Sequence, residues 1–101
     1  MCISTNKNKN GVVTISLGER FTFESQGDFL KAYREQPKET DYIINLKKTV
    51  YMDSSALGML LSLREHNGAK NKIRITACSS KIYKVLEIAR FSKIFQFDEK
   101  F

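Results

Sequence analysis

Residues 50–61 read Val50-Tyr51-Met52-Asp53-Ser54-Ser55-Ala56-Leu57-Gly58-Met59-Leu60-Leu61. Val50 to Met52 are apolar and suited to an extended conformation. Asp53 and two serines follow, and the apolar residues after them recur with the spacing of a helix. Asp and Ser are preferred where a helix begins, because their side-chain oxygens accept hydrogen bonds from the first backbone N–H groups. The stretch therefore predicts that an extended segment leads into a helix from Ser54 to about Asn67, with Gly68 as its terminator.

This helix has two different faces. At about 100° per residue, one arc carries small or polar residues and the rest is apolar. The wide apolar arc predicts packing against a sheet. Gly58 lies within the polar arc, where glycine costs a helix about 1 kcal/mol relative to alanine. Two explanations remain open: Gly58 admits the backbone of a partner, with Met59 and Leu61 along the edges of that surface, or it allows close packing within the domain. The polar arc comprises Ser54, Ser55, Gly58, Ser62 and Glu65.

Strand and helix patterns alternate on both sides of this stretch. Strands are predicted at residues 12–17, 20–23, 41–46, 72–78 and 94–97, and helices at 24–34, 54–67 and from Ser79 or Ser80 to 89. The first two strands are expected to form a hairpin with Phe21 and Phe23 on one face, and residues 41–46 a buried central strand. The order β-β-α-β-α-β-α-β predicts a single α/β domain, with a mixed β-sheet and helices packed against it.

Length and composition agree with one folded domain. The chain has 101 residues, of which 42% are hydrophobic and 28% charged. Residues 1–10 are polar and predict a flexible N-terminal tail, with the domain at residues 11–101. No apolar run approaches the roughly 20 residues of a membrane span, and no hydrophobic signal core follows Met1, so we expect a cytoplasmic protein without a membrane partner. Cys2 and Cys78 indicate neither a disulfide framework nor a metal site, and no motif asks for a cofactor. Cys78 is expected to be a small buried hydrophobe.

The formal net charge is +6. Such a charge is compatible with nucleic-acid binding, which stays an alternative function. The lysines and arginines are dispersed along the chain, however, with no long basic run interleaved with aromatics, so we expect a solvated surface instead.

An enzymatic role for Ser54 or Ser55 requires a base within hydrogen-bond reach. The one histidine, His66, follows Ser54 by twelve residues in the same predicted helix, about 18 Å along the axis, and is expected at the surface. The Gly-rich phosphate loop of nucleotide hydrolases is also missing. The sequence therefore predicts a protein that is not an enzyme.

The motif at residues 50–61, VYMDSSALGMLL, resembles the signature of STAS domains in bacterial anti-sigma factor antagonists, where Asp-Ser-Ser-Gly-Leu-Gly follows a strand and opens a helix. The resemblance extends over residues 11–97 and is to the proteobacterial single-domain type, in which residues 21–23 and 88–91 also have counterparts. Ala56 stands where glycine is usual. Alanine adds only a methyl group and favours the helix.

The resemblance implies a mechanism. Members bind a serine kinase anti-sigma factor or a related regulator through the surface around this helix start. The kinase phosphorylates the serine after the aspartate, here Ser54 with Ser55 as the runner-up, and a PP2C-type phosphatase reverses the reaction. The partner-binding residues implied are Asp53, Ser54, Ser55, Gly58, Met59, Leu61 and Ser62. A constitutive scaffold without phosphorylation is the alternative, and a weak homodimer is compatible with the predicted edge strand near the C-terminus.

Overall fold

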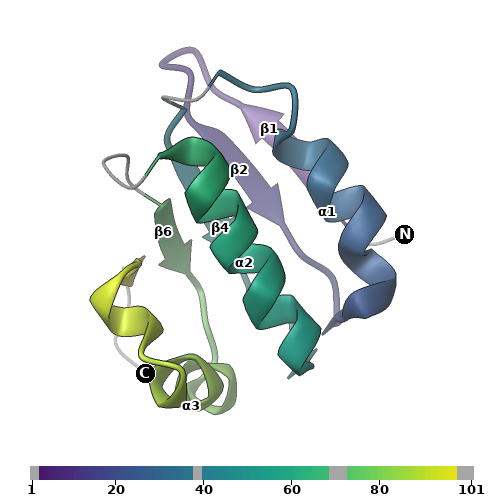
Figure 1. Cartoon of the computed structure of the whole chain (residues 1–101), viewed down its shortest axis with the longest axis vertical. Helices are drawn as coiled ribbons and strands as arrows, with labels where there is room; N and C mark the ends of the chain where they lie inside the picture. Colours follow the sequence, from purple (N-terminus) through teal and green to yellow (C-terminus); the bar gives the residue numbers. More distant parts are fainter. Residues whose placement is uncertain (1–2, 38–39, 69–72, 98–101) are drawn as a thin grey trace.

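Figure 1 shows the computed structural model of the chain, which describes residues 3–37, 40–68 and 73–97. Over these residues, five strands form a mixed sheet in the order β1-β2-β4-β6-β7. The first pair is antiparallel and the other neighbours are parallel. The predicted mixed sheet and the central position of residues 41–46 are confirmed. The strands are β1 (Ser4–Lys7), β2 (Val13–Ser16), β4 (Tyr42–Asn45), β6 (Ile73–Thr76) and β7 (Gln96–Phe97).

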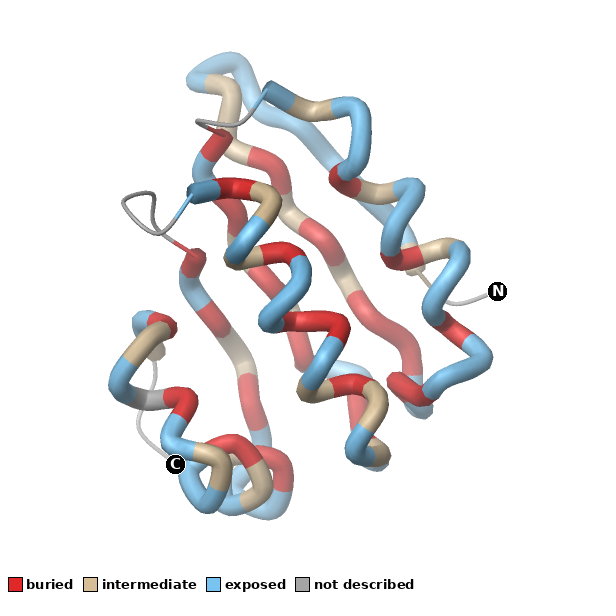
Figure 2. Tube along the Cα trace, viewed as in Figure 1, coloured by how far each residue is buried: buried red, intermediate tan, exposed pale blue. Residues whose placement is uncertain are grey.

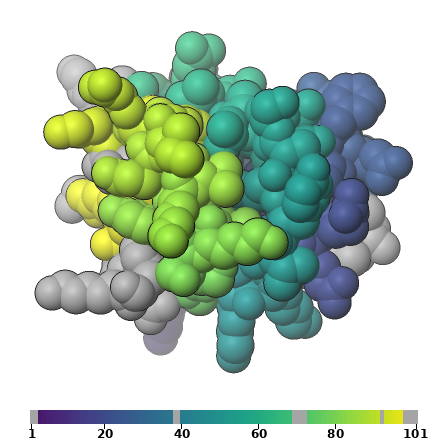
Figure 3. All heavy atoms as spheres, turned by 90° about the horizontal axis from the view of Figure 1, so that it is seen from below, coloured from purple at the N-terminus to yellow at the C-terminus, as the bar shows by residue number. Residues whose placement is uncertain are grey.

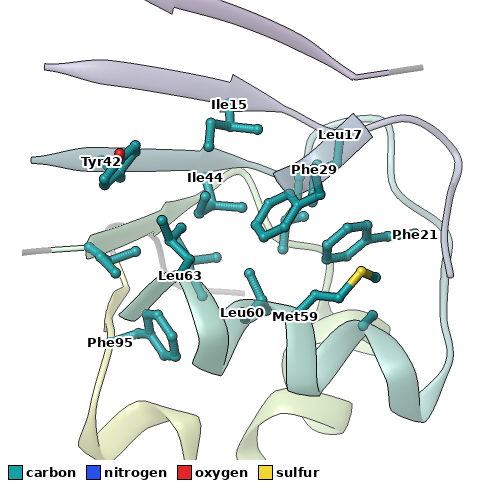
Figure 4. Packing of buried hydrophobic residues seen from close by; sticks show 14 of the residues in the cluster. Ile15, Leu17, Phe21, Phe29, Tyr42, Ile44, Met59, Leu60, Leu63 and Phe95 are labelled. Carbon is teal, nitrogen blue, oxygen red and sulfur yellow. The ribbon is translucent and has the colours of Figure 1, made fainter. Parts of the chain in front are cut away.

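Two helices, α1 (Gln26–Tyr33) and α2 (Ser54–Asn67), lie side by side on one face of this sheet (Figure 1). Side chains alternate between the faces of a strand, so every second residue of β2 and β4 points toward these helices. Ile15 and Ile44 do so and are fully buried, and Leu60 of α2 meets them in the core (Figure 4). The residues between them, such as Ser16 and Asn45, are only half-buried. Figure 2 shows this alternation as red and tan bands along the sheet.

The N-terminal segment differs from the prediction of a flexible tail over residues 1–10. Ser4–Lys7 form β1 and pair with β2 at the edge of the sheet. The turn between them is closed by the side chain of Asn8, whose Oδ1 accepts hydrogen bonds from the backbone N–H groups of Asn10 and Val12 at 2.8 and 3.0 Å. Gly11 adopts a φ of 83°, which favours glycine. The folded domain therefore begins before residue 11. The strand β1 is held by backbone pairing with β2, and its polar sequence has no apolar alternation that would predict a strand.

The predicted hairpin between residues 12–17 and 20–23 is wrong. The second strand, β3 (Arg20–Phe21), instead pairs in parallel with β5 (Tyr51–Met52) in a separate two-stranded sheet. The chain then turns into a short 3₁₀-helix, η1 (Phe23–Ser25), so Phe21 is buried while Phe23 is 64% exposed. Phe21 and Phe23 therefore do not share a face.

The C-terminal part follows the predicted order. Helix α3 (Ser80–Ile88) begins after Ser79, whose Oγ accepts a hydrogen bond from the backbone N–H of Ile82 at 3.2 Å. A 3₁₀ turn, η2 (Phe91–Lys93), leads to β7, which is shorter than the strand predicted at residues 94–97. Lys72, placed in a strand by the sequence, lies outside the described residues.

Candidate functional site

Asp53 joins two segments that are distant in sequence. One carboxylate oxygen, Oδ1, accepts a hydrogen bond from the backbone N–H of Ala56 at 3.0 Å and so caps α2. The other, Oδ2, accepts one from the backbone N–H of Phe23 at 3.1 Å. A single side chain therefore positions both the start of α2 and the start of η1.

Ser54 is the first residue of α2, and its side chain is exposed. Ser55 follows it and is only half-buried. At this end of a helix the first N–H groups lack intrahelical partners and the macrodipole is positive, so a negative group on Ser54 is electrostatically tolerated. Of the two serines, Ser54 is the more accessible to another protein.

The face of α2 that begins with Ser54 is exposed along two further turns. Gly58 and Ser62 lie on it as predicted, and Leu61, predicted at its edge, is 38% exposed. A Cβ atom built on Gly58 would meet nothing within 4 Å. Packing within the domain therefore gives no reason for glycine here, which removes one of the two explanations that the sequence left open.

Met59 does not lie on this surface. Its side chain is 6% exposed and belongs to the hydrophobic core, and in Figure 4 it points from α2 toward Phe21. On a helix Met59 lies about 140° round from Ser54, close to the arc of Leu60 and Leu63 that packs inward. The prediction that Met59 borders the partner-binding surface is corrected accordingly.

Two exposed aromatic residues near Asp53 were not among the residues predicted for the site. Phe23 is held by the hydrogen bond described above, and Tyr51, on β5, is 43% exposed with the guanidinium of Arg20 4.7 Å from its ring centroid. The sequence does contain a sign that the strand ends before Phe23, because Thr22 and Ser25 have the spacing of a helix cap. In the structure the backbone N–H of Thr22 donates to Ser25 Oγ at 3.4 Å. We call Phe23, Tyr51, Ser54, Gly58 and Leu61 the docking face.

Figure 3 shows this end of the molecule from below. The first turns of α2, in teal, lie at the surface between blue residues near 20–30 and the yellow-green C-terminal segment. Asp53 is half-buried, and both of its hydrogen bonds are accepted from backbone N–H groups. The arrangement presents exposed side chains of α2 at the surface of the molecule.

The other reactive groups are distant from this face or unreactive. His66 is half-buried near the far end of α2, with its ring centroid 5.1 Å from that of Tyr33, rather than at the surface as predicted. Cys78 is buried, as expected, and burial raises the pKa of its thiol to about 11. Cys2 lies outside the described residues.

Residues 3–37, 40–68 and 73–97 contain no group of three or more His, Cys, Asp or Glu side chains placed to hold a metal ion. None of their helices is both long and apolar enough to cross a bilayer.

Comparison with known proteins identifies the relatives of this chain. The family model described as "STAS domain" matches residues 5–101. A STAS-domain containing protein of Pseudomonas aeruginosa (strain UCBPP-PA14) is 41% identical over 86 residues, which cover 83% of this chain and 85% of the relative. The match to the family model begins at residue 5, within β1, so the family's domain includes this N-terminal strand.

Solved structures have the same fold at low sequence identity. An anti-sigma-factor antagonist (STAS) domain protein from Planctomyces limnophilus superposes with a TM-score of 0.82 at 15% identity, over 99% of this chain and 92% of that one. The anti-sigma factor antagonist SpoIIAA in its unphosphorylated form has a TM-score of 0.75 at 15% identity, with coverages of 99% and 90%. SpoIIAA of Bacillus in its phosphorylated form has a TM-score of 0.68 at 15% identity, with coverages of 98% and 93%.

Proposed function

Because the chain belongs to the STAS domain family, we propose that it is a cytoplasmic regulatory binding protein that is switched by phosphorylation. In this proposal the unphosphorylated protein binds a serine kinase anti-sigma factor or a related regulator and thereby sequesters it. The kinase phosphorylates Ser54, and a PP2C-type phosphatase restores binding. The protein itself carries out no catalysis.

The observation that carries the proposal is the placement of Ser54. It is an exposed hydroxyl at the first position of a long helix, within a face that also presents Gly58 and Leu61. Ser55 is less exposed than Ser54, so it ranks second as the phosphorylation site. SpoIIAA, which shares this fold, exists in phosphorylated and unphosphorylated forms.

Phosphorylation of Ser54 would change the docking face without unfolding the domain. A phosphate adds about −1.5 to −2 charges and three acceptor oxygens at the positive end of α2, where a negative charge is stabilised. The same group would be added at the tip of the α2 face that also presents Gly58 and Leu61, and burial of this face against a partner would require that the phosphate be desolvated. Moving a mostly bound population to mostly free takes several kcal/mol, which desolvation and repulsion at the centre of an interface supply.

The apolar members of the docking face would provide the affinity. Aromatic residues held in a fixed position are frequent binding hot spots, and Phe23 is both exposed and fixed by Asp53. Asp53 then acts as a positioning residue whose hydrogen bonds keep Phe23 and Ser54 in place, and the kinase brings its own catalytic base and nucleotide.

The first experiment is intact-mass analysis of the protein recovered from its native host, with fragmentation to locate phosphate. We expect one phosphate on the wild type, which disappears in Ser54→Ala and persists in the matched variant Ser55→Ala. Phosphate that persists in Ser54→Ala at full stoichiometry would refute the assignment of Ser54.

A binding measurement separates the switch from a constitutive scaffold. With the partner purified alongside Ser54→Ala and shown to transfer phosphate from ATP to serine, Ser54→Asp should weaken binding strongly. Ser62→Asp adds the same charge two turns along α2 and should have a much smaller effect. Equal affinities for wild type and Ser54→Asp would favour the scaffold.

A further inference from the structure

A second polar site lies on the face of the sheet opposite α1 and α2. Ser4, Ser16 and Asn45 are aligned neighbours in the pairing of β1, β2 and β4, so their side chains form one row across three strands. Ser16 and Asn45 alternate with the buried residues Ile15 and Ile44, which places this row on the outer face. The row borders a pocket of about 210 Å³ that Leu17, Lys47 and Lys48 complete.

The lining of this pocket is rich in hydrogen-bond donors. It includes two serine hydroxyls, one carboxamide and two lysine side chains, and among the described residues no carboxylate lines it. Asn45 Oδ1 accepts a hydrogen bond from the backbone N–H of Lys47 at 2.9 Å, which leaves the amide Nδ2 of Asn45 free to donate. Hydroxyl, amide and ammonium donors together form the chemistry that recognises a phosphate group.

The loop that supplies the lysines is tied down rather than loose. Thr49 is buried, its Oγ1 donates to the backbone carbonyl of Gly18 at 2.8 Å, and its N–H donates to the carbonyl of Leu46 at 3.0 Å. Lys47 and Lys48 come just after the carboxyl end of β4, which is paired with the carboxyl end of β2. In parallel sheets this end is where ligands commonly bind.

A larger open depression nearby provides a contrast. Its volume is about 570 Å³, and it is lined by Arg20 and Lys48 together with Glu19 and Glu24. The two carboxylates there oppose the binding of an anion. The smaller pocket lacks them, and its volume corresponds to roughly seven water molecules at about 30 Å³ each, enough for a phosphate group.

We propose that the pocket bordered by Ser4, Ser16, Asn45, Lys47 and Lys48 binds the phosphate group of a small phosphorylated molecule. The site lies on the opposite side of the sheet from α2, so it is separate from the docking face and goes beyond the function proposed above. Ligand occupancy and phosphorylation of Ser54 can therefore be measured independently.

The test is a titration of the full chain with inorganic phosphate, followed by the backbone amide signals in ¹⁵N-correlated NMR spectra. Sodium chloride at matched ionic strength is the reference. We expect saturable shifts at Ser4, Ser16, Asn45 and Lys47 with phosphate and not with chloride. Shifts that rise without saturation and match those caused by chloride would overturn the proposal.

Variants test the assignment to this pocket. Asn45→Asp retains an acceptor for the N–H of Lys47 but replaces the amide donor with a carboxylate, so phosphate binding should be lost while the spectrum stays folded. Lys47→Gln and Lys48→Gln should each weaken binding about fivefold. Lys84→Gln removes the same charge from the exposed surface of α3 and should leave the affinity unchanged. An equal loss in Lys84→Gln, or full binding by Asn45→Asp, would show diffuse charge attraction instead of a site.

Two further arms identify the source of the phosphate and the independence of the site. Phosphatidylcholine vesicles with and without phosphatidic acid separate a lipid headgroup from a soluble ester: sedimentation with phosphatidic acid that Asn45→Asp abolishes would assign the pocket to the lipid. Ser54→Ala should bind phosphate as the wild type does. This result keeps the pocket distinguishable from the switch, since either can fail while the other holds.

Discussion

Leu60 and Leu61 are neighbours in the sequence and have opposite surroundings. Leu60 is fully buried between α2 and the sheet, whereas Leu61 is 38% exposed beside Gly58 on the docking face. The same contrast holds for the whole helix: Ala56, Leu60 and Leu63 have no exposed surface, while Ser54, Gly58 and Ser62 face outward. One face of α2 therefore serves stability, and we propose that the other serves recognition.

The sharpest way to break this comparison is to truncate each leucine. Leu60→Ala should lower the free energy of unfolding by about 2–5 kcal/mol, because it leaves a cavity in a closely packed core. Leu61→Ala should change it by only about 0.5 kcal/mol. Urea denaturation followed by circular dichroism measures both. Similar losses in the two variants would mean that the faces of α2 are not distinct in the way described.

Phe23 tests the recognition side of the comparison. Phe23→Ala should weaken partner binding by about 2 kcal/mol, roughly 30-fold, since an exposed aromatic that is fixed in place acts as a hot spot. Calorimetric titration with the purified partner measures the change. The control is Ile88→Ala, which removes an 84% exposed apolar side chain on α3 and should leave the affinity as it is. If the two variants bind equally, Phe23 is not part of the interface.

Asp53 contributes to both stability and recognition. It caps α2, and it also accepts a hydrogen bond from the backbone N–H of Phe23. Asp53→Ala should cost about 1–2 kcal/mol of stability through the lost cap. It should also broaden or shift the NMR amide signal of Phe23, whose N–H loses its acceptor. Asp53→Asn keeps one side-chain oxygen and should restore most of the stability. An unchanged Phe23 signal in Asp53→Ala would argue against the positioning role.

Gly58 gives the smallest expected effect and separates folding from binding. Gly58→Ala should stabilise the domain by about 0.5–1 kcal/mol, since alanine favours the helix and its Cβ meets no other atom. The same variant should weaken partner binding if a partner backbone approaches at this point. A thermal denaturation curve and a binding titration on one preparation decide both. If Gly58→Ala raises the stability of the domain and leaves the affinity for the partner unchanged, the partner does not contact α2 at Gly58.

The periodic parts of the chain were predictable because local rules govern them. Apolar spacing located α2 to its last residue, with Asn67 followed by Gly68, and residues 41–46 were assigned to the central strand. Asp53 was assigned to the helix start because few residue types satisfy the first N–H groups there. These signals lie within a few residues of the feature that they specify.

The candidate site was only partly predictable for the opposite reason. Whether Phe23 is buried depends on the pairing of β3 with β5, in which Arg20 is aligned with Tyr51, rather than with its neighbour in sequence, β2. Met59 was assigned to the wrong face because a wide apolar arc does not reveal where its boundary lies until α1 packs beside α2. Ser4 entered the outer pocket through β1, an all-polar strand without an apolar pattern.

The sequence by itself determined the α/β class, the order of most elements, the cap at Asp53 and the serine at the tip of α2, because propensity, periodicity and capping act over one or two helical turns. Only the tertiary structure decided which side chains share a surface. Phe23 lies beside Asp53 through a hydrogen bond, and Ser4 lines the same pocket as Asn45 and Lys47 through the pairing of β1, β2 and β4. Such contacts depend on the free energy of the whole packed domain, which no local pattern encodes.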